Sequence, residues 1–266
     1  MALIEKELNK DILKTFIDIV EQDKKRRVPV IKFIRRGFLL ELVEKFKQAD
    51  KNISFIGITG ESASGKSTFV RTIIKKIKEI EQNKNKKLLN FISSDNYFND
   101  ISDKIKQYGS FDNFLVQENY NPDAPESFQL DLMRKHILQL AQNEGVYIPE
   151  YKVDGTGVSV KDAIYIDTAP IIMVEGIAVF YPKVRDLFDI KFYVEVDEQI
   201  RIERYIKRAI ESRHQTEQGA LEQYETINKS AAVYLRPQRQ YADIIINGNA
   251  NIEDFTEITE AFSRCF

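Results

Sequence analysis

Residues 60–68 read Gly60-Glu61-Ser62-Ala63-Ser64-Gly65-Lys66-Ser67-Thr68 and match the phosphate-binding pattern G-x-x-x-x-G-K-[ST]. The apolar, β-branched run at 53–58 predicts a buried strand before this loop, and the run at 66–80 has the spacing of an amphipathic helix. Strand, glycine-rich loop and helix form the context in which this pattern holds phosphate. We therefore expect the chain to bind a nucleoside triphosphate.

The composition is that of an ordinary globular protein, with 266 residues, 43% hydrophobic and 30% charged. A net charge of −2 provides no basic field to attract nucleic acid or an anionic membrane. Cys265 is the only cysteine, and His136 and His214 are the only histidines, so an internal disulfide is excluded and a metal centre built from these residue types is not expected. No apolar stretch approaches the roughly 18 residues of a membrane span and the N-terminus lacks an apolar signal core, so we expect a cytoplasmic protein.

Strand and helix patterns alternate from residue 53 onward, which is typical of a parallel α/β sheet. The polar segment 99–125 has no clear period, and a loop of this length in a compact domain is usually functional. Residues 145–168 have the pattern of a small hairpin or lid, with Gly155 and Gly157 at its turn. We expect a three-layer α/β fold with a mostly parallel sheet: strands over 53–58, 88–93, 170–175, 190–196 and 243–247, and helices over 66–80, 126–143, 198–212, 218–235 and 251–264.

The first 50 residues differ from this rhythm. Apolar residues at 3–20 and 31–47 have near-helical spacing, and Pro29 interrupts them. We predict an N-terminal helical extension, residues 1–50, docked on a catalytic domain at 51–266. The four cations at 24–27 are interpreted as a solvated loop, with a phosphate contact as the alternative. The extension could also provide a dimer contact, which would make the protein a homo-oligomer.

The residue types of the loop at 60–68 suit a triphosphate bound with a metal ion. Backbone N–H groups and the N-terminus of the following helix would hold phosphate oxygens. Lys66 is expected to bridge the β- and γ-phosphates, and the hydroxyl of Ser67 to bind Mg²⁺. A glycine turn with a capped helix would explain the glycines and the serine but not the lysine between them.

Two acids follow the next predicted strands. Asp95 comes just after strand 88–93, and because the carboxyl ends of such strands face the ligand crevice, we expect it beside the γ-phosphate. There it would act as a general base or a metal ligand, and a turn cap is the alternative. Glu175 ends an apolar strand at 170–175, where a carboxylate is expected to reach Mg²⁺ directly or through water.

Several motifs of this chain resemble the uridine kinase family and its relatives, phosphoribulokinase and the bacterial pantothenate kinases. The similarity runs from about residue 53 to 248 and implies a P-loop kinase fold that uses ATP and Mg²⁺ to phosphorylate a small-molecule hydroxyl. The motifs are Asp95-Asn96-Tyr97-Phe98, Asn121-Pro122-Asp123-Ala124-Pro125-Glu126-Ser127-Phe128-Gln129, Val174-Glu175-Gly176-Ile177, Arg201-Ile202-Glu203-Arg204-Tyr205-Ile206-Lys207-Arg208 and Tyr241-Ala242-Asp243-Ile244-Ile245-Ile246.

The resemblance implies a role for each matching residue. Asp95 would be the general base, and Asp123 would hold the hydroxyls of a ribose. Tyr151 would line the nucleoside pocket, and Tyr97, adjacent to the motif tyrosine that is Phe98 here, is a candidate for substrate contact. Basic lid positions would neutralise the transferred phosphate, although arginines at this spacing also fit a solvated helix face; Arg204 and Arg208 are assigned to catalysis, and Arg201 and Arg213 to substrate binding.

Two departures concern recognition of the acceptor. The family's histidine in the pyrimidine pocket is Thr156 here, and an arginine after the lid helix is Gln215. The string at 125–128 also resembles a motif of pantothenate kinases. The expected acceptor is the 5′-hydroxyl of uridine or cytidine, with pantothenate or another polyol-like metabolite as the alternative.

Two other function classes are alternatives to a kinase. A GTPase-type switch needs an Asn-Lys-x-Asp base reader, and the nearest string, at 228–231, lacks the Asp and falls in a predicted helix. A non-catalytic nucleotide-binding module that signals through a partner is the second. The presence of Lys66, Ser67, Asp95 and Glu175 favours an enzyme over such a module.

Overall fold

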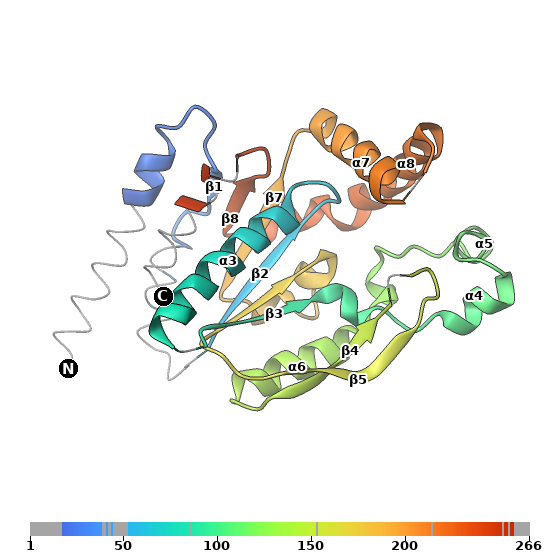
Figure 1. The fold of residues 1–266 in the computed structure, drawn as a ribbon, viewed down its shortest axis with the longest axis horizontal. Coiled ribbons are helices and arrows are strands. Elements are labelled where there is room, and N and C mark those ends of the chain that lie inside the picture. Colours follow the sequence, from blue (N-terminus) through green and yellow to red (C-terminus); the bar gives the residue numbers. More distant parts are fainter. Residues whose placement is uncertain are drawn as a thin grey trace.

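A computed structural model of the chain describes residues 18–38, 41, 44, 53–85, 87–152, 154–213, 215–251, 253–254 and 256–257. Its main sheet has six strands in the order β1-β8-β7-β2-β6-β3 (Figure 1). Neighbours from β8 to β3 are parallel, and only β1 is antiparallel to its neighbour among these described strands. The strands are β1 (Ile31–Ile34), β2 (Ser54–Gly60), β3 (Leu89–Ser93), β6 (Ile171–Glu175), β7 (Ile190–Glu195) and β8 (Ile244–Asn247). The predicted α/β fold with a mostly parallel sheet is confirmed.

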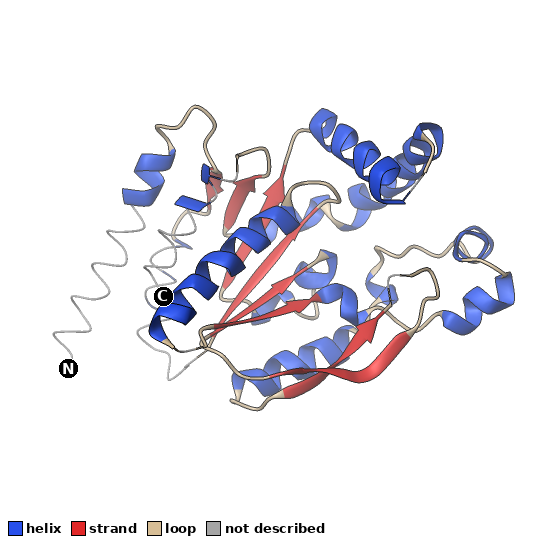
Figure 2. Cartoon of the chain, in the orientation of Figure 1, coloured by secondary structure: helices blue, strands red, loops and turns tan. Residues whose placement is uncertain are grey.

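Helices cover both faces of this sheet (Figure 2). In β2, Ile56 and Ile58 pack in one core cluster with Phe69 of α3, whereas Phe55 packs in a second cluster with Met133 of α6. Strands of a parallel sheet are apolar throughout because both faces are buried. The longer helices are α3 (Lys66–Lys84), α6 (Leu130–Ala141), α7 (Glu198–Arg213) and α8 (Glu217–Tyr234). No helix in the described part of the chain combines the length and the apolar character needed to cross a bilayer.

The segment between β3 and α6 contains two short helices, α4 (Ser102–Tyr108) and α5 (Phe111–Gln117), where an irregular loop was predicted. Gly109, with a φ of 78°, ends α4, and the hydroxyl of Ser110 accepts from the N–H of Asn113 to cap α5. Helices of two turns are too short to produce a recognisable apolar period.

The predicted hairpin at 145–168 is confirmed. It consists of β4 (Val146–Tyr151) and β5 (Ser159–Ile166), which pair antiparallel as a separate two-stranded sheet. The Asp100 carboxylate accepts from the N–H of Ser159 at 2.9 Å, so the hairpin is tied to the start of α4. Figure 1 shows the hairpin and α6 below the main sheet, with α4 and α5 beyond them.

The helical prediction for 31–47 is wrong at its start, because Ile31–Ile34 form strand β1. β1 pairs with β8, placing Ile31 opposite Ile246 and Ile34 opposite Ile244. Three of the four residues of β1 are apolar, a pattern that is compatible with a helix and with a strand. Pairing with the edge of β8 stabilises the strand. Residues 18–20 are helical as predicted, whereas most of 3–20, most of 39–47 and most of 251–264 lie outside the described residues. The domain boundary at residue 50 stays a prediction.

Candidate active site

The phosphate loop and the ends of β2, β3 and β6 line one cavity of about 1720 Å³. It is bordered by residues of α5 on one side and of α7 and α8 on the other. The cavity is lined by all nine residues of 60–68 and by the predicted site residues Asp95, Asp123, Glu175, Arg204 and Arg208. Residues more than 140 positions apart in the chain are therefore assembled around one space.

The loop at 60–68 has the predicted strand–loop–helix form, since β2 ends at Gly60 and α3 begins at Lys66. Gly65 precedes α3 with a φ of 95°, and no side chain caps the helix. Within the described residues, no acceptor is found for the N–H groups of Gly65, Lys66 and Ser67. Free N–H groups at a helix N-terminus, with no acid in its first turn, form an anion-binding site.

Lys66 forms an ion pair with Glu175, and both side chains are largely buried, with 15% and 13% exposed. The pair joins the start of α3 to the end of β6, as expected of two residues that flank a bound triphosphate. Gly176, which follows β6, allows the segment after β3 to come close. A Cβ at position 176 would lie 1.9 Å from Oγ of Ser94 and 3.4 Å from Oδ1 of Asp95. Glu175 and Asp95 are thereby brought to the same end of the cavity.

Asp95 lines the cavity and its side chain is exposed there. The surrounding protein weakens the hydration of its carboxyl and raises the pKa from 3.8 to about 6. The cation of Lys66 lowers the pKa, and the negative charges of Glu175 and Asp123 raise it. A carboxylate with this pKa is ionised at neutral pH and is a stronger base than an ordinary aspartate, which suits proton abstraction from a hydroxyl.

Asp123 lines the cavity and lies between η1 (Ser94–Tyr97) and α6 in the chain. Its N–H donates to Oδ1 of Asn121 at 2.9 Å, and the same oxygen accepts from the hydroxyl of Ser230 in α8 at 2.8 Å. Burial raises the pKa of the Asp123 carboxyl, and a hydrogen bond with Ser230 opposes this rise. Asp123 lines the cavity, and the hydrogen bonds of Asn121 hold its backbone to α8.

Arg204 and Arg208 project from α7 into the donor end of the cavity. Arg204 donates to the carbonyl oxygen of Gly248 at 2.8 Å, and Arg208 donates to Oγ of Ser62 at 2.9 Å. Both guanidinium groups therefore already lie beside the phosphate loop. Their positive charges, with that of Lys66, favour a polyanion in this part of the cavity.

Arg201 and Tyr97 are placed differently from the prediction. Arg201, on the same face of α7 as Arg204 and Arg208 but nearer the start of the helix, has 4% exposure and forms an ion pair with Glu61, the second residue of the phosphate loop. Tyr97 is fully buried, and its hydroxyl bonds Nδ1 of His136 at 3.1 Å. Neither side chain lines the cavity, so the predicted substrate contacts do not fit these two residues. The side chain of Arg213 lies outside the described part of the structure.

Tyr151 and the two positions that depart from the family pattern, Thr156 and Gln215, are absent from the lining of the cavity. The ring of Tyr151 lies 5.0 Å from that of Phe98, which lines the cavity, and burial raises the pKa of the Tyr151 hydroxyl to about 12. Thr156 donates its hydroxyl to Asp154 within the hairpin turn. Gln215 donates to Oε1 of Gln223 at 3.2 Å. Neither polar group lines the cavity, so these positions provide no substitute for the family's histidine and arginine.

Three cavity residues were not recognised from the sequence as site residues. Asn121 belongs to a quoted motif, and its role as a hydrogen-bonding centre for Asp123 and Ser230 depends on contacts across 109 positions. Ser230 has no sequence signal of its own, since serine is common in exposed helices. Gly248 could have been found, because it follows β8 and the carboxyl ends of parallel strands face the ligand crevice.

The residues present fit Mg²⁺ bound together with phosphates. Among the described residues there is no group of three or more His, Cys, Asp and Glu side chains that would hold a metal ion alone. Mg²⁺ at kinase sites does not require one, because it takes one or two carboxylates together with substrate phosphates and water. Ser67, Asp95 and Glu175 all line the cavity and offer oxygen donors of the kind Mg²⁺ prefers.

Comparison with known proteins agrees with this geometry. Residues 55–252 match the sequence model of the "Phosphoribulokinase / Uridine kinase family". Uridine-cytidine kinase A of Dictyostelium discoideum is 37% identical over 207 residues, which are 76% of this chain and only 38% of that protein. Uridine kinase of Borrelia turicatae is 31% identical over 215 residues, 80% of this chain and 95% of that protein.

The solved structures that resemble this chain support its fold only, because the sequence identity is low. A candidate fructose transport system kinase from Silicibacter sp. TM1040 superposes with a TM-score of 0.54 at 17% identity, covering 79% of this chain and 95% of that one. The fold and site thus define a P-loop kinase that acts on a small molecule. The chain belongs to the phosphoribulokinase and uridine kinase family.

Proposed function

We propose that this protein transfers the γ-phosphoryl group of ATP to the 5′-hydroxyl of uridine or cytidine. The observation that carries the proposal is that Lys66, Asp95 and Asp123 face one cavity, between the phosphate loop and the acceptor side. A kinase needs a donor site, a base and an acceptor site within reach of one another, because positioning and electrostatics provide most of its catalysis.

At the donor end, free N–H groups of the loop and of α3 hold the triphosphate. Lys66 contacts the β- and γ-phosphates, and its present partner Glu175 remains beside it. Arg204 and Arg208 approach from α7 and neutralise the charge of the phosphoryl group in transfer. Ser67, with Asp95 or Glu175, would hold Mg²⁺, which would neutralise part of the phosphate charge.

At the acceptor end, Asp123 accepts hydrogen bonds from the ribose hydroxyls and so points the 5′-hydroxyl at Asp95. Asp95 then takes the proton of the 5′-hydroxyl. The oxygen of that hydroxyl forms a bond to the γ-phosphorus of ATP, and the bond between this phosphorus and the leaving oxygen of ADP breaks. The raised pKa of Asp95 supports this role, because the carboxylate must attract a proton without being protonated beforehand.

The choice of a pyrimidine nucleoside rests on two kinds of support. Relatives named uridine kinase are similar over most of this chain, and Tyr151 lies beside the acceptor end through its contact with Phe98. Against it, Thr156 and Gln215 use their polar groups within the protein. A pantothenate-like or other polyol acceptor is therefore the alternative substrate, and a non-catalytic nucleotide-binding module is the alternative function.

A coupled assay of ADP release tests the proposal against both alternatives. Uridine, cytidine, adenosine, pantothenate and simple sugars are supplied in turn with ATP and Mg²⁺, and the rate is compared with that of the protein alone. Stimulation by uridine or cytidine supports the proposal. Stimulation by pantothenate or a sugar alone would replace the acceptor, and no stimulation by any compound would favour the non-catalytic module.

A further inference from the structure

The segment after β8 forms part of the cavity wall. Gly248, Ala250, Asn251 and Glu253 all line the cavity on the side of the phosphate loop. The segment approaches the loop very closely, because a Cβ on Gly248 would lie 1.6 Å from the carbonyl oxygen of Ser64. Residues 247–251, 253 and 254 are called the C-terminal wall below.

From inside the cavity, α7 fixes this wall. Arg204 donates to the carbonyl oxygen of Gly248 at 2.8 Å and to Oδ1 of Asn249 at 3.2 Å. The N–H of Gly248 donates to the carbonyl oxygen of Glu195 at the end of β7. A displacement of the wall would therefore move Arg204 and the surface that faces the phosphate loop.

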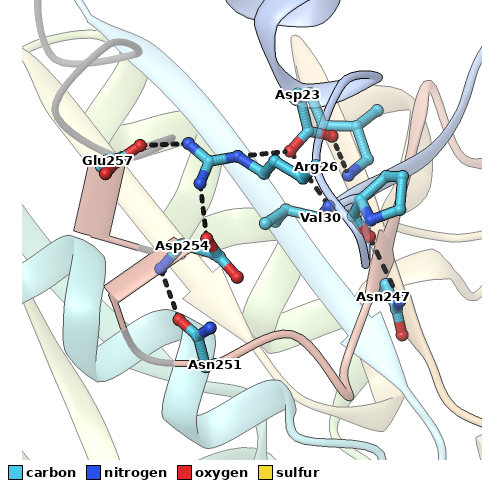
Figure 3. A network of polar contacts seen from close by, with 9 residues as sticks. Asp23, Arg26, Val30, Asn247, Asn251, Asp254 and Glu257 are labelled. Carbon is cyan, nitrogen blue, oxygen red and sulfur yellow. Dashed lines mark hydrogen bonds and ion pairs between the residues drawn. The ribbon is translucent and has the colours of Figure 1, made fainter.

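From outside, residues 23–31 hold the same wall (Figure 3). The N–H of Asn247 donates to the carbonyl oxygen of Val30 at 2.7 Å, and its side-chain amide donates to that of Pro29 at 3.1 Å. Arg26 forms ion pairs with Asp254 and Glu257. The N–H of Asp254 in turn donates to Oδ1 of Asn251, a residue of the cavity wall.

Asp23 connects Arg26 to the backbone at the start of β1. Its carboxylate is 1% exposed, accepts from the N–H groups of Val30 and Ile31 at 3.1 and 2.7 Å, and pairs with Nε of Arg26 at 3.2 Å. The side chain of Arg26 is only 20% exposed, so the interpretation of 24–27 as a solvated loop is wrong for this residue. Charge-assisted hydrogen bonds that are shielded from water are stronger than those on the surface.

We propose that Asp23 and Arg26 are positioning residues for nucleotide binding, acting through Asp254 on the C-terminal wall. Both Arg26 and Asp254 lie outside residues 55–252, which match the family model. The proposal rests on the proposed function, because it requires the nucleotide to occupy the cavity beside the wall. It gives residues 18–34 a role in the affinity for nucleotide, whereas the acceptor side, formed around Asp123, should be unaffected.

The test is calorimetric titration of the full chain with ADP and Mg²⁺, with KM for the acceptor measured alongside. Arg26→Ala should raise the Kd for ADP about fivefold, at the low end of the range for coupled sites, and leave KM for the acceptor unchanged. Arg27→Ala is the matched control, because Arg27 is exposed and makes no polar contact within the described residues. Arg26→Lys, which keeps the charge, should restore part of the affinity.

Asp254→Asn provides a second route that keeps the size of the side chain, and it decides the question if Arg26→Ala does not fold. It should also raise the Kd for ADP, and the double variant should be no worse than Arg26→Ala alone, since both changes remove the same ion pair between Arg26 and Asp254. Equal Kd values for wild type, Arg26→Ala and Asp254→Asn would overturn the proposal. Failure of the wild-type protein itself to bind ADP would instead refute the proposed function, and the inference with it.

Discussion

Lowering the pH through about 6 should switch off the proposed base, Asp95. Its pKa is raised from 3.8 to about 6 because the cavity walls limit its hydration. An acid acts as a base only when ionised, so activity should be full well above the pKa and should fall as the pH drops through it. At about pH 5 only about 9% of a group with pKa 6 is ionised, whereas an ordinary aspartate would remain about 94% ionised.

The assay is kcat/KM between about pH 5 and about pH 8 with ATP and acceptor both well below KM, so that the free enzyme is reported. Mg²⁺ is kept in excess, and circular dichroism verifies that the protein stays folded across the range. We expect about a tenfold loss at about pH 5 relative to the plateau. Asp95→Asn should lower the plateau by about 10²- to 10⁴-fold and retain ADP binding. A wild-type profile that stays flat down to about pH 5 would refute the raised pKa of the base.

Three further substitutions separate the catalytic residues from the structural ones. Lys66→Ala should abolish measurable phosphoryl transfer, because it removes a phosphate contact and leaves the carboxylate of Glu175 without its ion pair; retained turnover in the ADP-release assay would contradict this. Tyr97→Phe should lower the free energy of unfolding by about 1 kcal/mol through loss of the buried bond to His136, with an unchanged KM for the acceptor. A raised KM would restore Tyr97 as a substrate contact. Arg201→Ala should destabilise the fold by about 2 kcal/mol, because the largely buried carboxylate of Glu61 loses one arginine partner and keeps Arg236, and urea unfolding measures this. A stability equal to that of wild type would show that the ion pair contributes nothing.

Local patterns in the sequence predicted the parts of the fold that local physics determines. The loop at 60–68 fixed a strand before it and a helix after it, and Gly155 and Gly157 marked the turn of the β4–β5 hairpin. Strand β1 could not be predicted in this way, because it exists through pairing with Ile244–Ile246 more than 200 positions away. Long-range pairing leaves no trace in the local period of a four-residue segment.

The candidate site, too, has features that the local sequence predicts and features that depend on the folded structure. Acids at the ends of predicted strands, Asp95 and Glu175, were found because the carboxyl ends of parallel strands share one edge. Which of two adjacent side chains faces the cavity was not predictable, as Tyr97 and Phe98 show, since the turn at η1 decides it. Likewise a repeat of arginines on one helix face does not reveal which of them is buried, and Arg201 contacts Glu61 in the interior.

The most direct test of the central claim is detection of the product. Wild-type protein is incubated with ATP, Mg²⁺ and uridine, and mass spectrometry is used to detect uridine 5′-monophosphate together with an equal amount of ADP. We predict that the monophosphate forms with wild-type protein and is reduced by at least about 10²-fold with Asp95→Asn. No monophosphate with wild type, or equal amounts with both proteins, would contradict the account.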